Sequence, residues 1–329
     1  MRKPHPDSEE ALENAVLSEI FGHMLGWETM NCYSEELGEN GTLGRKNREE
    51  VVLVRHLRAA IAQLNPSIPP KAINLAIEEL TRNRSAFSLT SANQELYQLI
   101  RNGVKVSFRD DDNEEQVETV KVIDWNRPTA NHFLVVSQLW ISGEYGNKRA
   151  DLIGFVNGLP LVFIELKAHH KRLENAYKKN LADYKQTIPQ LFWYNALIIL
   201  SNGSKSRIGS VTASWEYFGE WKKITSEGEE GVISLDTILQ GTCEKQRLLD
   251  LIENYVFFYT ARGSIVKIIA KNHQYLGVNN AIQAVREIEH NQRKLGVFWH
   301  TQGSGKSYSM VFFTPILRTK LEQVLSLKP

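Results

Sequence analysis

The stretch from Ala150 to His170 (A-D-L-I-G-F-V-N-G-L-P-L-V-F-I-E-L-K-A-H-H) constrains this chain most, because it has the pattern of two apolar strands joined by a tight turn. The apolar runs are 152–156 and 161–166, and an Asn-Gly pair at 157–158 is typical of a hairpin turn. Between residues 150 and 167, charge interrupts the pattern only at Asp151, Glu165 and Lys167. Charged side chains are rarely buried without partners, so partners must be found for these three.

The length of the turn decides whether Asp151 joins the other two residues. Side chains alternate along a strand, so Glu165 and Lys167 share one face. A two-residue loop at 157–158 places Asp151 opposite Ile164, with Glu165 pointing away. A three-residue loop at 157–159 places Asp151 opposite Glu165, with a glycine available for its left-handed position. We favour the three-residue loop.

Two carboxylates and a lysine on one sheet face indicate a divalent-metal site. Carboxylate oxygens are suitable ligands for Mg²⁺, and the bound ion lowers the pKa of a water molecule and neutralises phosphate charge. The lysine can position the attacking water or help to deprotonate it. The spacing resembles the PD-(D/E)xK nuclease core, with Asp151 as the acidic residue and 165–167 as the ExK triplet. The alternative is a structural ion pair. A second triplet, 220–222, lacks a preceding apolar hairpin with an acidic residue.

Length and composition place the chain among ordinary globular proteins. The 329 residues suggest about two domains, with 42% hydrophobic and 23% charged residues. The net charge of +1 means that any DNA contact must come from local patches. Cys32 and Cys243 stand too far apart in the sequence for a metal cluster or a disulfide framework, so we expect a reducing cytoplasm. The N-terminus lacks the apolar run of a signal peptide, and no apolar stretch is long enough to span a membrane.

The order of predicted elements fits the αβββαβ arrangement of that nuclease core. Amphipathic patterns predict helices at 8–25, 49–64, 71–83 and 91–101, and alternating patterns predict strands at 104–108, 116–125 and 132–141. A polar loop at 143–149 then leads into Asp151. After the hairpin, a helix at 173–186 and a strand at 195–200 are expected, followed by a strand-like segment at 208–224 and helices at 234–239 and 244–259. The fold class is therefore α/β, with a mixed sheet flanked by helices.

Several polar residues around the hairpin are candidates for binding. Lys171, Arg172 and Lys178 are candidates for contacts to DNA phosphates, and a solvated helix face is the alternative. His169 and His170 could ligate a metal, but we expect them to be exposed. Glu13 neighbours the apolar stripe of the first helix and could approach a metal, although solvation is the expectation.

A second motif lies near the C-terminal end. An apolar strand is predicted at 295–299, followed by H-T-Q-G-S-G-K-S at 300–307 and a helix at 308–317. A strand, a glycine-rich loop and a helix in this order form a P-loop, whose backbone N–H groups cradle phosphates. Lys306 would reach the β and γ phosphates, and Ser307 would bind Mg²⁺. The pattern departs from the usual one at His300, which replaces the first glycine. The predicted nucleotide-binding residues are Gly303, Ser304, Gly305, Lys306 and Ser307.

Only 22 residues follow Ser307, and none forms an apolar strand ending in acidic residues. Such a strand usually supplies the second Mg²⁺ contact and the residue that positions the attacking water. We therefore expect the chain to stop inside an ATPase domain, so that the ATPase is incomplete. The predicted domains are an endonuclease domain at 1–260 and the beginning of a helicase-like ATPase domain at 261–329.

A nuclease core followed by F-W-H-T-Q-G-S-G-K-S closely resembles the restriction (R) subunit of type I restriction enzymes, over essentially the whole chain. The resemblance implies an endonuclease domain joined to a superfamily 2 motor that translocates double-stranded DNA using ATP and cuts unmodified DNA at distant sites. Methyltransferase (M) and specificity (S) subunits are the implied partners. The implied nuclease residues are Asp151, Glu165 and Lys167, with Mg²⁺ held by the two carboxylates. Lys306 and Ser307 would contact ATP and its Mg²⁺.

The resemblance implies roles for two further residues. Related recombination nucleases carry a Gln-x-x-x-Tyr element on the helix after the ExK triplet, and 180–184 has that spacing with Asn180 in place of glutamine. Tyr184 is carried over on this basis as a nucleic-acid contact. The segment 271–275 resembles the adenine-reading segment of such motors, and Gln274 is the candidate because an amide can pair with the adenine edge.

Overall fold

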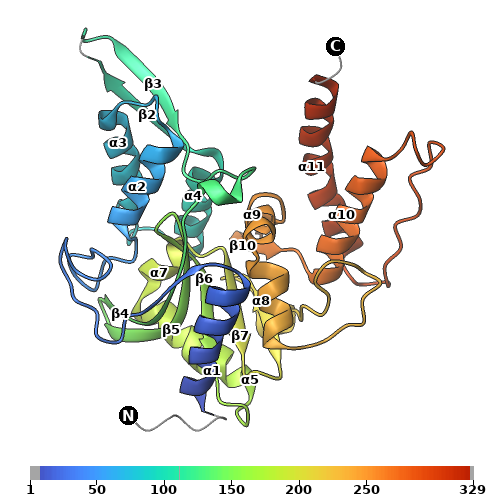
Figure 1. Cartoon of the computed structure of the whole chain (residues 1–329), viewed down its shortest axis with the longest axis horizontal. Coiled ribbons are helices and arrows are strands. Elements are labelled where there is room, and N and C mark those ends of the chain that lie inside the picture. The colour runs from blue at the N-terminus through green and yellow to red at the C-terminus, as the bar shows by residue number, and fades with distance from the viewer. Residues whose placement is uncertain (1–7, 111, 327–329) are drawn as a thin grey trace.

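A six-stranded mixed sheet lies at the centre of the molecule (Figure 1), in the order β1-β4-β5-β6-β7-β8. The structure is a computed structural model that describes residues 8–110 and 112–326, so the outer ends of the two predicted domains lie outside it. The β1–β4 and β6–β7 pairs are parallel, and the other neighbours are antiparallel. The strands are β1 (Glu28–Asn31), β4 (Phe133–Gly143), β5 (Gly146–Val156), β6 (Leu159–Leu166), β7 (Leu197–Ser201) and β8 (Ser206–Gly209).

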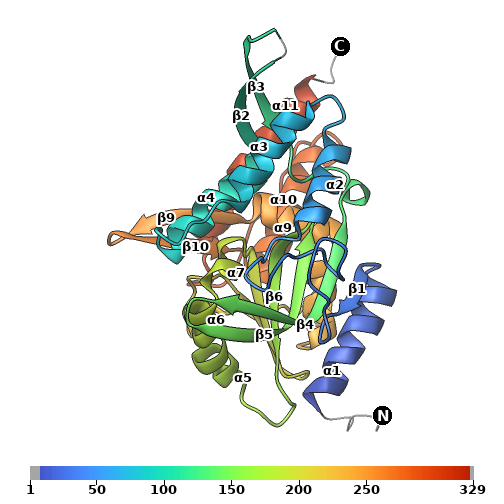
Figure 2. The ribbon, with the colours of Figure 1, turned by 90° about the vertical axis from the view of Figure 1, so that its left-hand side faces the viewer.

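Helices cover the sheet, and two antiparallel hairpins project from it (Figures 1 and 2). The hairpins are β2 (Val104–Arg109) with β3 (Glu115–Val120), and β9 (Val256–Ala261) with β10 (Ser264–Ile269). The helical segments before the central hairpin are α1 (Glu9–Ala15), η1 (Val16–Met24), α2 (Val54–Leu64), α3 (Pro70–Thr81), α4 (Leu89–Asn102) and η2 (Pro128–Ala130). Those after it are α5 (Leu173–Asn175), η3 (Ala176–Leu181), α6 (Ala182–Thr187), α7 (Pro189–Trp193), η4 (Trp215–Tyr217), α8 (Leu235–Cys243), α9 (Lys245–Asn254), α10 (Asn272–Arg286) and α11 (Lys306–Ser326).

Local chemistry explains where several helices begin and end. The Ser8 hydroxyl accepts a hydrogen bond from the Ala11 N–H at 3.1 Å, and the serines before α4 and α8 cap those helices in the same way. The first helix continues as the π-helical segment η1 and ends before Gly26, whose φ of 64° only glycine adopts at little cost. The predicted helix at 8–25 is thereby confirmed.

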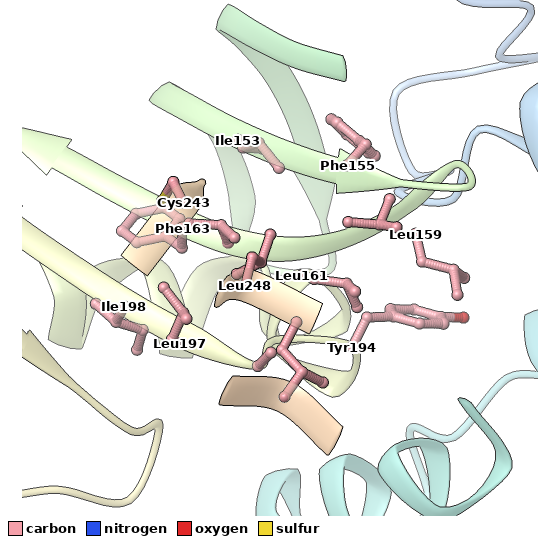
Figure 3. Packing of buried hydrophobic residues seen from close by; sticks show 14 of the residues in the cluster. Ile153, Phe155, Leu159, Leu161, Phe163, Tyr194, Leu197, Ile198, Cys243 and Leu248 are labelled. Atoms are coloured by element: carbon pink, nitrogen blue, oxygen red, sulfur yellow. The ribbon is translucent and has the colours of Figure 1, made fainter. Parts of the chain in front are cut away.

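The core lies around the central hairpin. Every residue of β6 is buried, as expected for a strand covered on both faces. Figure 3 shows part of the buried cluster, which includes Ile153 and Phe163 of the hairpin, Ile198 of β7, and Cys243 and Leu248 of α8 and α9. Cys32 and Cys243 are both buried and free, so neither forms a disulfide. No helix of the described chain is both long and apolar enough to cross a membrane.

Two predictions before the central hairpin were wrong. The predicted loop at 143–149 is mostly strand, because Gly146 already opens β5 and residues 146–149 pair with the end of β4. This end of the hairpin is polar because it faces solvent, so its periodicity carries no apolar signal. The helix predicted from residue 49 begins at Val54, because the Leu53 N–H donates to the Gly158 carbonyl at 2.9 Å and is therefore not available for a helical hydrogen bond.

Three predictions after the central hairpin also failed. The helix expected at 244–259 ends at Asn254, and the aromatic residues that follow form β9, which pairs with β10 across a turn at Arg262-Gly263. In the segment 208–224 only the β8 residues form a strand. The apolar run 295–299 is not a strand. Val297 is 92% exposed, and no strand in the described ranges pairs with it, so its backbone has no sheet to join.

Candidate active site

The register of the β5–β6 hairpin brings Asp151 opposite Glu165, but not through the predicted loop. The turn has two residues, because Val156 pairs with Leu159 across Asn157-Gly158, so the three-residue loop was wrong. A bulge at Leu161 then shifts the register by one residue, and Leu152 pairs with Ile164 instead of Phe163. A bulge inserts one unpaired residue into one strand. It therefore has the same effect on Asp151 as the longer loop would have had.

Buried contacts fix this turn. Asn157 is fully buried with a φ of 51°, and Gly158 follows with a φ of 79°. The Asn157 amide donates to the carbonyl of Val122 at 2.9 Å, and its side-chain oxygen accepts from the N–H of His132 at 2.8 Å. A Cβ on Gly158 would lie 2.5 Å from the Leu53 carbonyl oxygen. The tight turn is thus specified by the loops packed around it as much as by its own two residues.

The two carboxylates and the lysine meet at the end of the hairpin. Asp151 Oδ2 accepts from the backbone N–H of Leu166 at 2.8 Å. Glu165 is 1% exposed, and its Oε1 accepts from Lys167 Nζ at 2.6 Å. The other carboxylate oxygen, Glu165 Oε2, is buried and has no hydrogen-bond partner in the described part of the chain. A buried carboxylate oxygen without a donor needs an explanation, and a cation ligand position is one.

Burial and mutual repulsion set the protonation of this group. Burial first, and the neighbouring Asp151 second, raise the pKa of Glu165 to about 8. Burial also raises the pKa of Asp151. Burial alone would lower the pKa of Lys167, but the two carboxylates outweigh it and raise that pKa above its usual value. The ammonium group is therefore the positive charge that this structure places against the pair.

The helix that follows the hairpin supports the site from the side. Asn180 in η3 donates from Nδ2 to Glu165 Oε1 at 2.6 Å. Tyr184, predicted to contact nucleic acid, is 7% exposed, and its hydroxyl donates to the Arg149 carbonyl at 2.6 Å. The Tyr184 side chain therefore packs against β5 and does not face solvent. Both residues project from one helical face because they are four residues apart.

Glu13 lies in a different environment from the one predicted. The structure buries it to 6% exposure and places Gln138 Nε2 as a donor to its carboxylate, so the expectation of a solvated side chain was wrong. Burial, with a contribution from Asp151, raises the pKa of Glu13 to about 7. A glutamate beside the apolar stripe of an amphipathic helix, next to Leu12, was the available signal. A third carboxylate thus lies within electrostatic reach of the pair.

The remaining predicted binding residues lie at the surface. His169 and His170 are exposed, as expected. Lys171 pairs with Glu9 at 2.9 Å and Lys178 with Glu174 at 2.8 Å, so both charges are compensated, while Arg172 is exposed. The second ExK triplet holds a local Lys222–Glu220 ion pair at 2.9 Å around a buried Trp221.

The glycine-rich loop at 300–305 leads into α11. Gly303 and Gly305 have φ values of 80° and 89°, and Lys306, the first residue of the helix, donates to the His300 carbonyl at 2.8 Å. Gln274 is 1% exposed, and its amide nitrogen donates to the Gly305 carbonyl at 3.0 Å. The cavity beside Ser304 measures about 140 Å³, less than the 300 Å³ or so typical of ligand pockets. A nucleotide could therefore bind here only if the loop or the Gln274 amide moved. Ser307, the second residue of α11, is exposed.

Comparison with known proteins identifies the class. Residues 6–217 match the family described as the type I restriction enzyme R protein N terminus, which is well over half of the chain, and the chain belongs to this family. Residues 273–326 match the SWI2/SNF2 ATPase family, which suggests the start of a motor domain.

Two relatives are similar over nearly the whole chain. The HindI type I restriction enzyme endonuclease subunit of Haemophilus influenzae is 35% identical over 317 residues, which are 93% of this chain and 30% of that protein. The putative MjaIXP type I restriction enzyme endonuclease subunit of Methanocaldococcus jannaschii is 27% identical over 339 residues, which are 93% of this chain and 31% of that protein. The chain therefore spans about a third of the length of these relatives.

Proposed function

We propose that this chain carries a PD-(D/E)xK nuclease centre that hydrolyses phosphodiester bonds of double-stranded DNA with Mg²⁺. The observation that carries the proposal is the meeting of Asp151, Glu165 and Lys167 at the end of one buried hairpin, with Lys167 Nζ 2.6 Å from Glu165 Oε1. Burying a charge costs free energy, and a structural ion pair with Lys167 needs only one carboxylate. A purely structural role therefore does not explain why two carboxylates are buried side by side. Membership of a restriction endonuclease family supports the same reading.

The residues present fit a magnesium ion. Within the described residues no cluster of three or more His, Cys, Asp or Glu side chains is assembled around one point, so the candidate ligands are the pair Asp151 and Glu165. Mg²⁺ commonly uses one or two carboxylates and keeps several waters. The unpartnered Glu165 Oε2 is the free ligand atom that such an ion needs. When bound, the ion would supply charge neutralisation at the phosphate and a more acidic water.

The other side chains prepare the site for this ion. Asn180 holds the Glu165 carboxylate by a bond to Oε1, which leaves Oε2 free. The backbone N–H of Leu166 holds Asp151 in the same way, by a bond to Oδ2. Lys167 now neutralises the pair, and a cation in its place would release the ammonium to hold an attacking water or a phosphate oxygen. Binding the ion would also displace the proton that burial favours on Glu165.

For the whole protein we propose the R-subunit role. Its DNA translocation, driven by ATP, would use Gly303, Gly305, Lys306 and Ser307 at the nucleotide, with Gln274 toward the adenine once the loop opens. Partner M and S subunits, unmodified DNA as substrate and a cytoplasmic location belong to the same proposal. The names of the relatives and the SWI2/SNF2 match support it. The division of the chain into 1–260 and 261–329 also remains a proposal. Thr260 falls within β9.

The test is cleavage of a DNA duplex by the whole chain with and without Mg²⁺. Cleavage should require the ion, and Lys167→Ala or Glu165→Gln should slow it by about a hundredfold or more, because transition-state charge loses its stabilisation. Lys222→Ala, from the second ExK triplet, is the matched control and should cleave like the parent. A chain that binds Mg²⁺ and DNA but never cuts would leave the carboxylates structural and the chain a module for nucleotide binding or subunit assembly.

A further inference from the structure

Four side chains next to the acidic pair form one stacked row, which we call the arginine–aromatic ladder: Arg48, Trp140, Arg149 and Tyr33. Trp140 lies directly opposite Arg149 in the β4–β5 register. The Arg149 guanidinium carbon lies 5.5 Å from the Trp140 ring centre and 5.3 Å from the Tyr33 ring centre. Arg48 covers the Trp140 ring as well, at 5.7 Å. Two cations from distant parts of the sequence thus share one aromatic surface.

The ladder begins beside the proposed nuclease residues. Arg149 stands two residues before Asp151 on β5, so their side chains leave the same face of the sheet about 7 Å apart. Burial is the largest cause of the raised pKa of Asp151, and the Arg149 charge is among the groups that oppose it. The positive charge of Arg149 therefore acts on the acidic pair through Asp151.

Among the described residues, 8–110 and 112–326, the two arginines have no ion-pair partner, and Arg149 acts on Asp151 and Glu13 only at longer range. Both arginines are exposed. The lysines predicted to bind DNA, Lys171 and Lys178, differ in this respect, because each is paired with a glutamate. An unpaired cation next to a site for phosphate chemistry has a natural anionic partner in the DNA backbone.

Hydrogen bonds hold the backbone that carries the two arginines. The Arg149 carbonyl accepts from the Tyr184 hydroxyl at 2.6 Å, and the Arg48 carbonyl accepts from the N–H of Ser142 at 2.9 Å. A guanidinium stacked on a ring keeps its N–H donors at its edge, free for a phosphate. Two guanidinium groups lie over the Trp140 ring, whereas the Tyr33 ring is 60% exposed. Because the substrate of the proposed nuclease is a duplex, the phosphates of a duplex are the expected partners of these exposed guanidinium groups.

We propose that the ladder holds the backbone of a DNA duplex beside the Asp151–Glu165–Lys167 site, with Arg149 nearest to the reacting phosphate and Arg48 further along the strand. The proposal rests on the proposed nuclease function and adds to it the path of the substrate across the protein. It shifts the DNA contact surface from the helix after the hairpin to the β4–β5 hairpin and the loop around Arg48.

The test is binding of a fluorescent duplex by the whole chain, followed by anisotropy without divalent ions so that the DNA stays intact. Arg149→Ala and Arg48→Ala should each weaken binding by about three- to tenfold and lower the salt slope, log K against log salt, by about 0.9. Arg149→Lys keeps the charge and should keep the slope. Lys105→Ala is the control, because Lys105 is exposed on the distant β2–β3 hairpin (Figure 1), and it should bind like the parent.

Three results would overturn the ladder: no duplex binding by the parent chain at about 50 mM salt, unchanged salt slopes in both arginine variants, or tighter binding of a single strand than of the duplex. The slope matters because a purely structural role for an arginine would change affinity without removing a phosphate contact. Failure of the nuclease proposal looks different. In that case the chain binds DNA through the ladder but does not cut it with Mg²⁺.

Discussion

At the scale of single residues, a third carboxylate lies within electrostatic reach of Asp151 at the end of the central hairpin. Asp151 and Glu165 face each other across β5 and β6, and Glu13 approaches from the first helix, with its pKa raised to about 7 by burial and by Asp151. Glu13 has a donor in Gln138, so it is held in place rather than free to turn to solvent. A carboxylate held near a cation site strengthens the site even when it does not ligate the ion.

We therefore predict that Glu13→Gln weakens use of the metal. The substitution keeps the shape of the side chain and removes its charge, so the Mg²⁺ concentration for half-maximal cleavage should rise about tenfold. The measurement is the cleavage rate of a duplex across a Mg²⁺ titration. Glu19→Gln, an exposed glutamate in η1, is the matched control. Equal midpoints for the parent and Glu13→Gln would show that Glu13 has no influence on the ion.

At the scale of elements, the central hairpin depends on a turn that is buried instead of exposed. Asn157 connects it to the loop carrying Val122 and to His132 just before β4, and Gly158 connects it to Leu53 before α2. These contacts leave no room for a longer loop, so the register must be corrected inside β6, at the Leu161 bulge. The position of Asp151 opposite Glu165 is thus a property of the packed sheet.

Asn157→Ala should destabilise the chain by about 2–4 kcal/mol, because it leaves a buried carbonyl and a buried N–H unpaired and keeps a left-handed backbone. Asn113→Ala is the matched control, since Asn113 has a similar φ of 64° at an exposed turn. It should cost about 1 kcal/mol. Urea unfolding of both variants measures the difference. Equal losses would mean that backbone strain, and not the buried contacts, accounts for the role of Asn157.

At the scale of the whole molecule, one buried lysine ties the second hairpin to the central core. Lys267 in β10 is 1% exposed, and its Nζ donates to Asn195 O at 2.6 Å and to Asn93 Oδ1 at 3.1 Å. Burial lowers the pKa of Lys267 to about 7. The segment that follows the boundary predicted near Thr260 is therefore packed against α4 and the loop before β7.

This burial predicts a pH-dependent stability. Between pH 7 and 10.5 the unfolded chain keeps the Lys267 proton and the folded chain loses it, so the free energy of unfolding should rise with pH in this range. The slope from one proton is at most about 1.4 kcal/mol per pH unit. Lys267→Met should remove this part of the rise, and Lys105→Met, at an exposed site, should keep it. Urea unfolding at several pH values between 7 and 10 checks both variants. Parallel curves for the parent and Lys267→Met would contradict the assigned pKa.

The sequence by itself identified the candidate site residues of this protein and much of its secondary structure. Alternation and apolar runs identified the hairpin, its three charged residues and the glycine-rich loop, because burial leaves a periodic trace in residue type. Tertiary structure alone decided the register, the burial of Glu13 and the stacking of Arg48 and Arg149 on one ring. These depend on contacts between residues far apart in the chain, and local periodicity does not record which distant segment lies against which strand.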